Sequence, residues 1–169
     1  MASGKVHAIA YRKGIVLSIV ASLVLAGFVD PAAIYGPLGA LGGMLVDPDL
    51  SDQHNITTHT EHRMWRISPL VGYVFQVYWY PLSILIRHRS WLSHWPLVGT
   101  TLRIVYLFGP PLSYILVYWY GYPFDPLGWA QYIWSHRESY RGLGWMYAWW
   151  SYQDFVHFRL DGFRATRIG

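Results

Sequence analysis

The chain has 169 residues, of which 53% are hydrophobic, 18% are aromatic and only 13% are charged. This length suits one domain, and the low charge content leaves too little polar surface for an ordinary soluble domain. The absence of cysteine excludes disulfides, thiolate metal sites and cysteine nucleophiles. The net charge of +4 comes from arginines spread over segment ends, which argues against nucleic acid as a partner.

Two uncharged runs, 14–29 and 32–46, lie near the N-terminus and are separated by Asp30 and Pro31. Asp-Pro favours the start of a helix, with the carboxylate as N-cap and the proline in the first turn. We therefore expect two short helices joined near Asp30, each slightly below the ~20 residues of a full membrane span. A signal peptide is the alternative for the first run. Because no small-x-small cleavage site precedes the second run, we expect the segment to be retained.

The middle of the chain holds the strongest candidate span, the 20 uncharged residues at 67–86, which follow a polar loop expected at 50–66. Residues 97–120 are apolar apart from Arg103, and Pro110-Pro111 predicts one helix before the prolines and another after them. We expect a turn at 121–128, an interfacial helix at 129–141 and a final amphipathic helix at 142–162.

These features together predict an all-α integral membrane protein. Trp and Tyr favour the boundary between lipid and water, and the arginines stand where flanks of lipid-buried segments are expected. The expected fold is a single helical membrane domain over residues 1–169, with about four membrane-embedded segments and polar residues at the segment ends. Membrane lipids are therefore the expected partners, and the expected location is a membrane that the chain crosses several times.

Ionisable residues that suit metal binding stand at two of the early segment ends. His7 precedes the first apolar run, and alone it is equally well explained as a polar residue near a helix start. Asp47 and Asp49 follow the second apolar run. Negative charge is disfavoured at the C-terminal end of a helix, so a divalent cation or a nearby arginine should compensate. A solvated turn is the alternative reading of this pair.

A third group, His88, Arg89 and His94, lies between two apolar runs. Two histidines six residues apart do not share one face of a continuous helix, so a local bend is needed for them to converge. Neutral imidazole is a common ligand of zinc, iron, nickel and copper. Arg89 alternatively holds an anionic group such as phosphate through paired N–H bonds. A basic juxtamembrane loop is the simplest explanation of the group.

The fourth group lies in the final expected helix, where His157 and Asp161 are four residues apart. Residues at this spacing share a helix face, which suits two ligands of one ion, although an ordinary surface pair has the same spacing. Asp154, one turn before His157, is a further candidate. Ionisable groups near lipid are costly and usually functional, so their presence at four segment ends favours a shared site.

These pieces resemble a family of uncharacterised bacterial membrane proteins described as metal-binding. The chain is also similar, more distantly, to membrane-bound metal-dependent hydrolases related to zinc-dependent phospholipase C. The most specific matching piece is HRSWLSHWPLVGTTLRIVYL at 88–107. The shorter matching pieces are SGKVHAIA at 3–10, VDPDL at 46–50 and H-x-x-x-D at 157–161. The resemblance implies a bacterial inner-membrane location.

The resemblance also implies a set of metal ligands drawn from four chain segments, namely His7, Asp47, Asp49, His88, His94, His157 and Asp161. Seven ligands suit two ions better than one. The family commonly has Gly where Trp95 stands, and the loop at 51–66 is longer here. This departure leaves the roles of His59 and His62 open, and we take His54 as an extra ligand. Nitrogen and oxygen ligands favour Zn as the divalent ion, with Mn or Fe as alternatives.

Three functions fit these observations. The first is a metal-dependent hydrolase of a lipid-like phosphoester, in which Arg89 binds the phosphate and Asp49 orients the attacking water. The second is a non-catalytic metal-binding or structural subunit of a larger membrane complex, because the aromatic excess offers broad surfaces to partners. The third is a haem or chlorin protein with a histidine axial ligand, which visible absorption would reveal.

Overall fold

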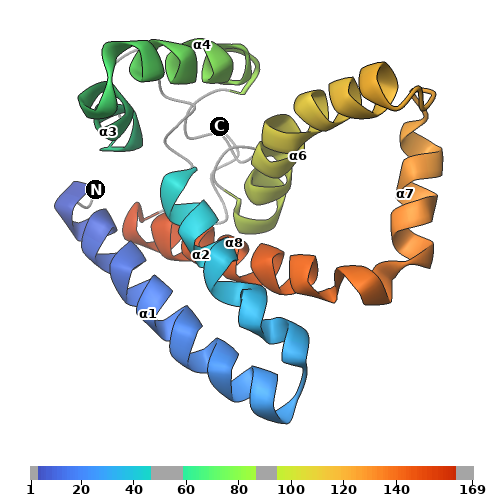
Figure 1. Ribbon diagram of the computed structural model, residues 1–169. Coiled ribbons are helices and arrows are strands. Elements are labelled where there is room, and N and C mark those ends of the chain that lie inside the picture. The colour runs from blue at the N-terminus through green and yellow to red at the C-terminus, as the bar shows by residue number, and fades with distance from the viewer. Residues whose placement is uncertain (1–3, 47–58, 87–94, 163–169) are drawn as a thin grey trace.

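The computed structural model describes residues 4–46, 59–86 and 95–162, and every regular element in these ranges is a helix (Figure 1). The helices, with 3-10 and π segments marked η, are α1 (Gly4–Phe28), η1 (Pro31–Tyr35), α2 (Gly36–Leu45), α3 (His59–Ile67), α4 (Pro69–Leu85), α6 (Pro96–Tyr114), η3 (Ile115–Trp119), α7 (Pro126–Ser135), η4 (Arg137–Tyr140) and α8 (Arg141–Leu160). The described residues therefore confirm the all-α class.

The connection between the first two long helices forms as the Asp-Pro pair predicts. Asp30 has an extended backbone and accepts a hydrogen bond from the Ala32 N–H, so it caps η1, with Pro31 in the first turn. The start of α1 differs from the expectation. The helix begins at Gly4 and includes His7, and the basic residues that precede the uncharged run, Arg12 and Lys13, lie on its exposed side.

α8 packs against both α1 and α2, and these three helices lie together in Figure 1. The approach of α2 to α8 depends on glycine, since a Cβ built on Gly39 would lie 1.8 Å from the Met146 carbonyl oxygen. Such small residues let helix backbones come close where little else drives them together. Close packing of α2 on α8 in turn brings the end of α2 beside the C-terminal half of α8.

α1 and α8 also meet at the far end of α1, where an ion pair joins Asp30 to the first residue of α8. The Arg141 guanidinium lies 3.0 Å from the Asp30 carboxylate, and the Trp145 indole N–H donates to the same carboxylate at 2.8 Å. The hydrogen bond from Trp145, with those from Ala32 and Arg141, holds the pKa of Asp30 below its ordinary value. The two helices are thus antiparallel and fixed at this end by a charged contact.

The segment expected to be a polar loop up to residue 66 is helical over its described part. α3 forms over His59–Ile67 and returns through Ser68 into α4. The Trp65 ring lies over Gly72, where no side chain intervenes. This contact between neighbouring helices stabilises the helical hairpin. The polar composition of the segment predicted a loop because composition does not record such a contact. α3 and α4 lie beside each other at one side of the molecule (Figure 1).

The helix break expected at Pro110-Pro111 is absent, because α6 continues through both prolines to Tyr114 and then passes into the π segment η3. Neither proline has an N–H, so the carbonyls one turn earlier, those of Tyr106 and Leu107, lose their usual helical partners. The Tyr78 hydroxyl of α4 donates to both of them, at 2.8 and 2.9 Å. A neighbouring helix therefore supplies the hydrogen bonds that the prolines remove.

Two helices in the described part of the chain are long and apolar enough to cross a bilayer, Val6–Phe28 and Pro96–Trp119. The expected spans at 32–46 and 67–86 correspond to shorter helices, α2 with 10 residues and α4 with 17. The described residues therefore offer two candidate spans where about four membrane-embedded segments were expected.

We expect Tyr78→Phe to destabilise the protein by about 1–3 kcal/mol, because two partly buried carbonyls of α6 would lose their only side-chain donor in the described structure. Urea unfolding in detergent measures the loss. Tyr73→Phe is the matched control, since Tyr73 lies on the same helix and is 60% exposed. Equal stability of the two variants would show that the Tyr78 hydroxyl does not support α6.

Candidate metal centre

Three candidate ligands from opposite ends of the chain meet at one point. His7 comes from α1, and His157 and Asp161 come from the last turns of α8. One ligand atom from each lies within 4.8 Å of the other two. His157 is 1% exposed and His7 and Asp161 are partly buried, so the group is largely screened from solvent.

The local helix geometry explains why these side chains converge. His157 and Asp161 are four residues apart on α8, and His7 and Tyr11 are four residues apart on α1. Each pair therefore occupies one face of its helix. Because α1 and α8 pack against each other, the two faces meet, and the His7 and His157 rings stack with centroids 4.5 Å apart.

The distances between donor atoms suit a small cation. His7 Nε2 lies 3.2 Å from one Asp161 oxygen, and His157 Nε2 lies 3.0 Å from the other. Ligands ~2.1 Å from a tetrahedral ion are separated by about 3.4 Å, slightly more than these two distances and less than the 4.8 Å within which all three ligand atoms lie. The buried His7 Nε2 makes no hydrogen bond in the described part of the chain, although it faces the carboxylate. A divalent ion would satisfy that nitrogen.

Tyr11 holds the second histidine in place. Its hydroxyl is hydrogen-bonded to His157 Nδ1 at 2.7 Å, and Tyr11 is buried. A histidine that binds metal through Nε2 carries its proton on Nδ1 and usually donates it to a neighbouring acceptor. The Tyr11 oxygen is suited to accept that proton. With a cation on Nε2, this contact would hold His157 in the tautomer protonated at Nδ1, and without a cation the Tyr11 hydroxyl can donate to Nδ1 instead.

Asp154 does not join the candidate ligands, although it lies one turn before His157. It is fully buried and forms an ion pair with Arg103 of α6, and the Thr100 hydroxyl also donates to it. The structure thus assigns Asp154 to the contact between α6 and α8. Arg103 within an apolar run was the sequence signal for a buried partner, but the sequence did not identify that partner.

The other candidate residues lie outside the described residues, namely Asp47, Asp49, His54, His88, Arg89 and His94. The described residues that flank them in the sequence lie close to α8. Val46 and Ile86 belong to one buried cluster with Trp150 of α8. Trp95 packs edge-on against Phe158, the residue next to His157, with ring centroids 6.1 Å apart. His62, by contrast, is exposed on α3.

Comparison with known proteins gives one match. A family model described as "Uncharacterized metal-binding protein (DUF2227)" matches residues 2–153. The matched span includes His7 and ends just before Asp154, His157 and Asp161. No curated protein and no solved structure matches the chain.

Loss of Arg103 should destabilise the protein strongly. Arg103→Met would leave the Asp154 carboxylate buried without its cation, at a cost of about 3–5 kcal/mol. The double variant Arg103→Met with Asp154→Leu should recover most of this loss, because two apolar side chains carry no desolvation penalty. Urea unfolding in detergent measures both, with exposed Arg66→Met as the control. A double variant no more stable than the single one would refute the pairing.

Proposed function

Because the chain belongs to the family of metal-binding proteins whose model it matches, we propose that His7, His157 and Asp161 hold a divalent ion at one end of a membrane-embedded helical protein. The observation that carries the proposal is the convergence of three donor atoms from α1 and α8 on one buried point. Zinc is the ion we favour, with Mn or Fe as alternatives, since the donors are two imidazoles and a carboxylate.

The distribution of polarity supports the membrane location. Serines 18 and 22, Gln153 and Asp154 are completely buried, whereas Val16, Val20 and Leu23 are more than half exposed on α1. Only 22% and 11% of the most apolar windows of the two candidate spans are buried, which does not suit core helices of a soluble protein. Lipid would cover these apolar faces, and the polar groups would stay inside. We place the protein in a membrane that it crosses more than once.

A second ion would use the ligands implied by the family resemblance, Asp47, Asp49, His88 and His94, with His54 as an extra ligand. The position of their described neighbours supports this assignment. Val46 and Ile86 pack in the cluster around Trp150, and Trp95 packs against Phe158. These contacts place Val46, Ile86 and Trp95, the described residues that flank the two segments, beside the middle and the C-terminal half of α8.

We further propose that the chain hydrolyses a lipid-like phosphoester. A bound divalent ion lowers the pKa of coordinated water and polarises a phosphoryl oxygen. Arg89 would bind the phosphate through paired N–H bonds, and Asp49 would orient the attacking water. His7, His157 and Asp161 support this reaction class because three protein ligands leave one position of a tetrahedral ion for water, as in catalytic zinc sites.

Metal analysis of the purified protein tests the site. We expect the wild type to retain divalent metal and His7→Ala to bind it at least tenfold more weakly, because one of three ligands is lost. Tyr11→Phe should weaken binding by about 10–100-fold, since the partner of His157 Nδ1 is removed. Titration with zinc, followed by elemental analysis, measures both effects.

His136→Ala is the matched control for this titration, because His136 is exposed and stands outside the candidate site. Its affinity for zinc should equal that of the wild type. His94→Ala should lower the stoichiometry from two ions to one. Unchanged zinc binding by His7→Ala would remove the centre on α1 and α8, and unchanged stoichiometry in His94→Ala would remove the second ion.

Hydrolysis is tested with the zinc-loaded protein and phospholipid in mixed micelles. We expect release of a phosphorylated head group that chelators abolish. Arg89→Ala should mainly raise KM, because phosphate binding is lost, and Asp49→Asn should mainly lower kcat. Arg66→Ala serves as the control for loss of an exposed positive charge. A metal-loaded protein inert toward phospholipids and soluble phosphoesters would leave the non-catalytic subunit as the function.

A further inference from the structure

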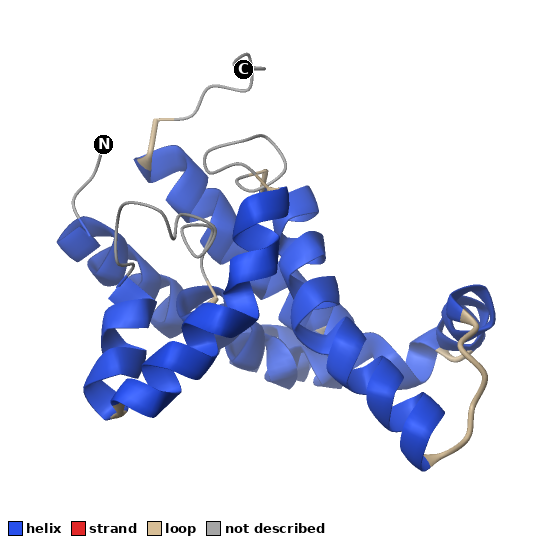
Figure 2. Ribbon diagram, turned by 90° about the horizontal axis from the view of Figure 1, so that it is seen from above, coloured by secondary structure: helices blue, strands red, loops and turns tan. Residues whose placement is uncertain are grey.

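The segment after α6 forms an exposed arm that leaves the rest of the molecule. The aromatic arm comprises η3, residues 120–125 and α7, and neither helix has a buried residue. It extends outward before the chain returns to α8 (Figures 1 and 2). Its exposed aromatic residues are Tyr118, Trp119, Tyr120, Tyr122, Phe124, Tyr132 and Trp134. An aromatic surface of this size needs a covering phase or partner.

The chemistry of the aromatic arm favours the lipid–water boundary. Tyr and Trp combine an apolar ring with one polar atom, the property that concentrates them at membrane interfaces. The only charged residue of the arm, Asp125, accepts a hydrogen bond from Gly128 N–H and caps α7. A depression of about 380 Å³ lined by Ile115, Trp119 and Tyr120 offers space for part of an acyl chain.

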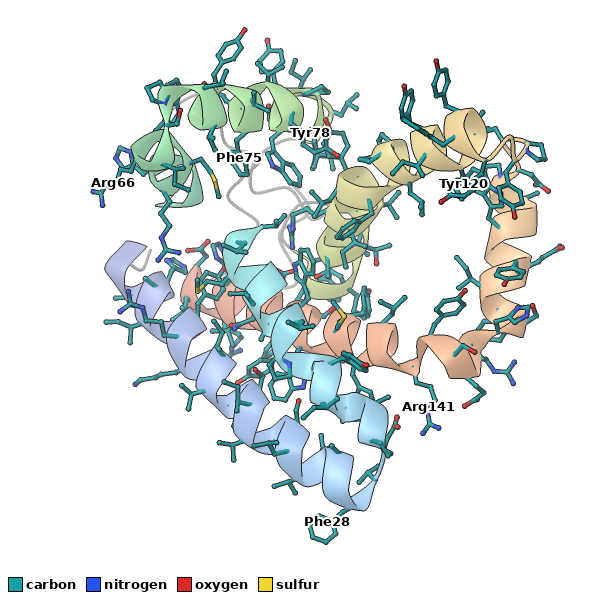
Figure 3. The ribbon with its side chains drawn as sticks, in the orientation of Figure 1. Phe28, Arg66, Phe75, Tyr78, Tyr120 and Arg141 are labelled. Carbon is teal, nitrogen blue, oxygen red and sulfur yellow. The ribbon has the colours of Figure 1, made fainter. Side chains whose placement is uncertain are left out.

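Basic residues follow the arm. The Arg137 guanidinium lies 5.5 Å from the centre of the exposed Trp134 ring, and Arg141 begins α8. Arginine beside aromatic residues suits the head-group layer, where anionic lipids attract positive charge. Figure 3 shows Tyr120 on the arm and Arg141 where the chain returns to the helices that hold the candidate metal centre.

Helix lengths place the arm far from the candidate metal centre. The continuous helical stretch Pro96–Trp119 has 24 residues, which corresponds to about 36 Å at ~1.5 Å per residue. Its first turn follows Trp95, which packs against Phe158, the residue next to His157 in sequence. The hydrocarbon core of a bilayer is about 30 Å thick. A helix that begins at the centre therefore reaches the arm after one bilayer thickness.

α1 has a comparable length. From His7 to Phe28 it rises about 32 Å at ~1.5 Å per residue. Its far end, at Asp30, is paired with Arg141, which lies just after the arm in sequence. α1 therefore runs from the candidate ligands to the Asp30–Arg141 pair, where the chain returns from the arm to α8.

We propose that the aromatic arm lies in the head-group region of the leaflet opposite the candidate metal centre and anchors the protein to that interface. The occupant of this surface is the lipid bilayer itself. The inference rests on the membrane location given under the proposed function, and it adds the depth of the arm and the sidedness of the two ends.

The absence of cysteine makes a direct test simple, because each introduced cysteine is the only one. Tyr118→Cys and Tyr132→Cys on the arm, and Val20→Cys on α1, are labelled with an environment-sensitive fluorophore. The full chain is placed in vesicles of phosphatidylcholine and phosphatidylglycerol with nitroxide lipids. Both arm positions should be quenched at least about twofold more by head-group nitroxide than by mid-chain nitroxide. Val20 should show the reverse order.

Sidedness is tested with Arg159→Cys beside the candidate centre and Glu138→Cys beside the arm, both at exposed positions. A membrane-impermeant maleimide added to sealed vesicles of uniform orientation should label one of them and spare the other until detergent is added. Labelling of both before detergent would overturn the opposite-leaflet placement.

The outcomes separate the two proposals. Lipid quenching at Val20 without quenching at Tyr118 or Tyr132 would overturn the arm inference and leave the membrane location intact. Protection of the arm in detergent micelles together with a dimeric mass would assign the surface to a second copy and also overturn it. Absence of lipid quenching at all three positions would overturn the membrane location itself.

Discussion

The arrangement of the described helices depends on the buried polar face of α8. Gln153, Asp154 and His157 are at most 1% exposed and point to different neighbours. The Gln153 amide donates to the Tyr11 carbonyl of α1 and to the Ala40 carbonyl of α2, at 3.1 and 3.4 Å. Asp154 binds α6, and His157 binds the Tyr11 hydroxyl. Because a buried polar group without a partner is costly, these three residues fix the positions of α1, α2 and α6 against α8.

Beside this polar face, the buried apolar cluster of the described residues is small and lies around Trp79 and Trp150. The large exposed apolar side chains lie on the outside of α1, α4 and α6, and the buried residues include serine, threonine, glutamine, aspartate and arginine. In the proposed membrane location, apolar side chains would gain nothing by leaving the surface, and close backbone packing and hydrogen bonds would decide which helices associate. Gly39 against Met146 and Tyr78 against the Tyr106 carbonyl are examples of each.

The sequence predicted what depends on local spacing. It identified the all-helical class, the cap at Asp30 and the shared face of His157 and Asp161, because capping and the helical repeat act within a few residues. It did not identify Tyr11 as the partner of His157, which is 146 residues away, or Asp154 as the partner of Arg103.

Two of the helix boundaries that the sequence predicted wrongly, at Pro110-Pro111 and at residues 59–67, have related causes. The prolines of α6 do not end the helix because a tyrosine from α4 binds the freed carbonyls. The segment at His59–Ile67 is helical because Trp65 packs on Gly72. Both depend on contacts between helices that no local pattern records.

The candidate metal ligands also depend on contacts between helices that are distant in sequence. An ion shared by His7 and Asp161 would close a loop of more than 150 residues, where closure is entropically most costly. Because metal binding adds its free energy to folding, the ion would favour the arrangement of α1 on α8 that creates its own site.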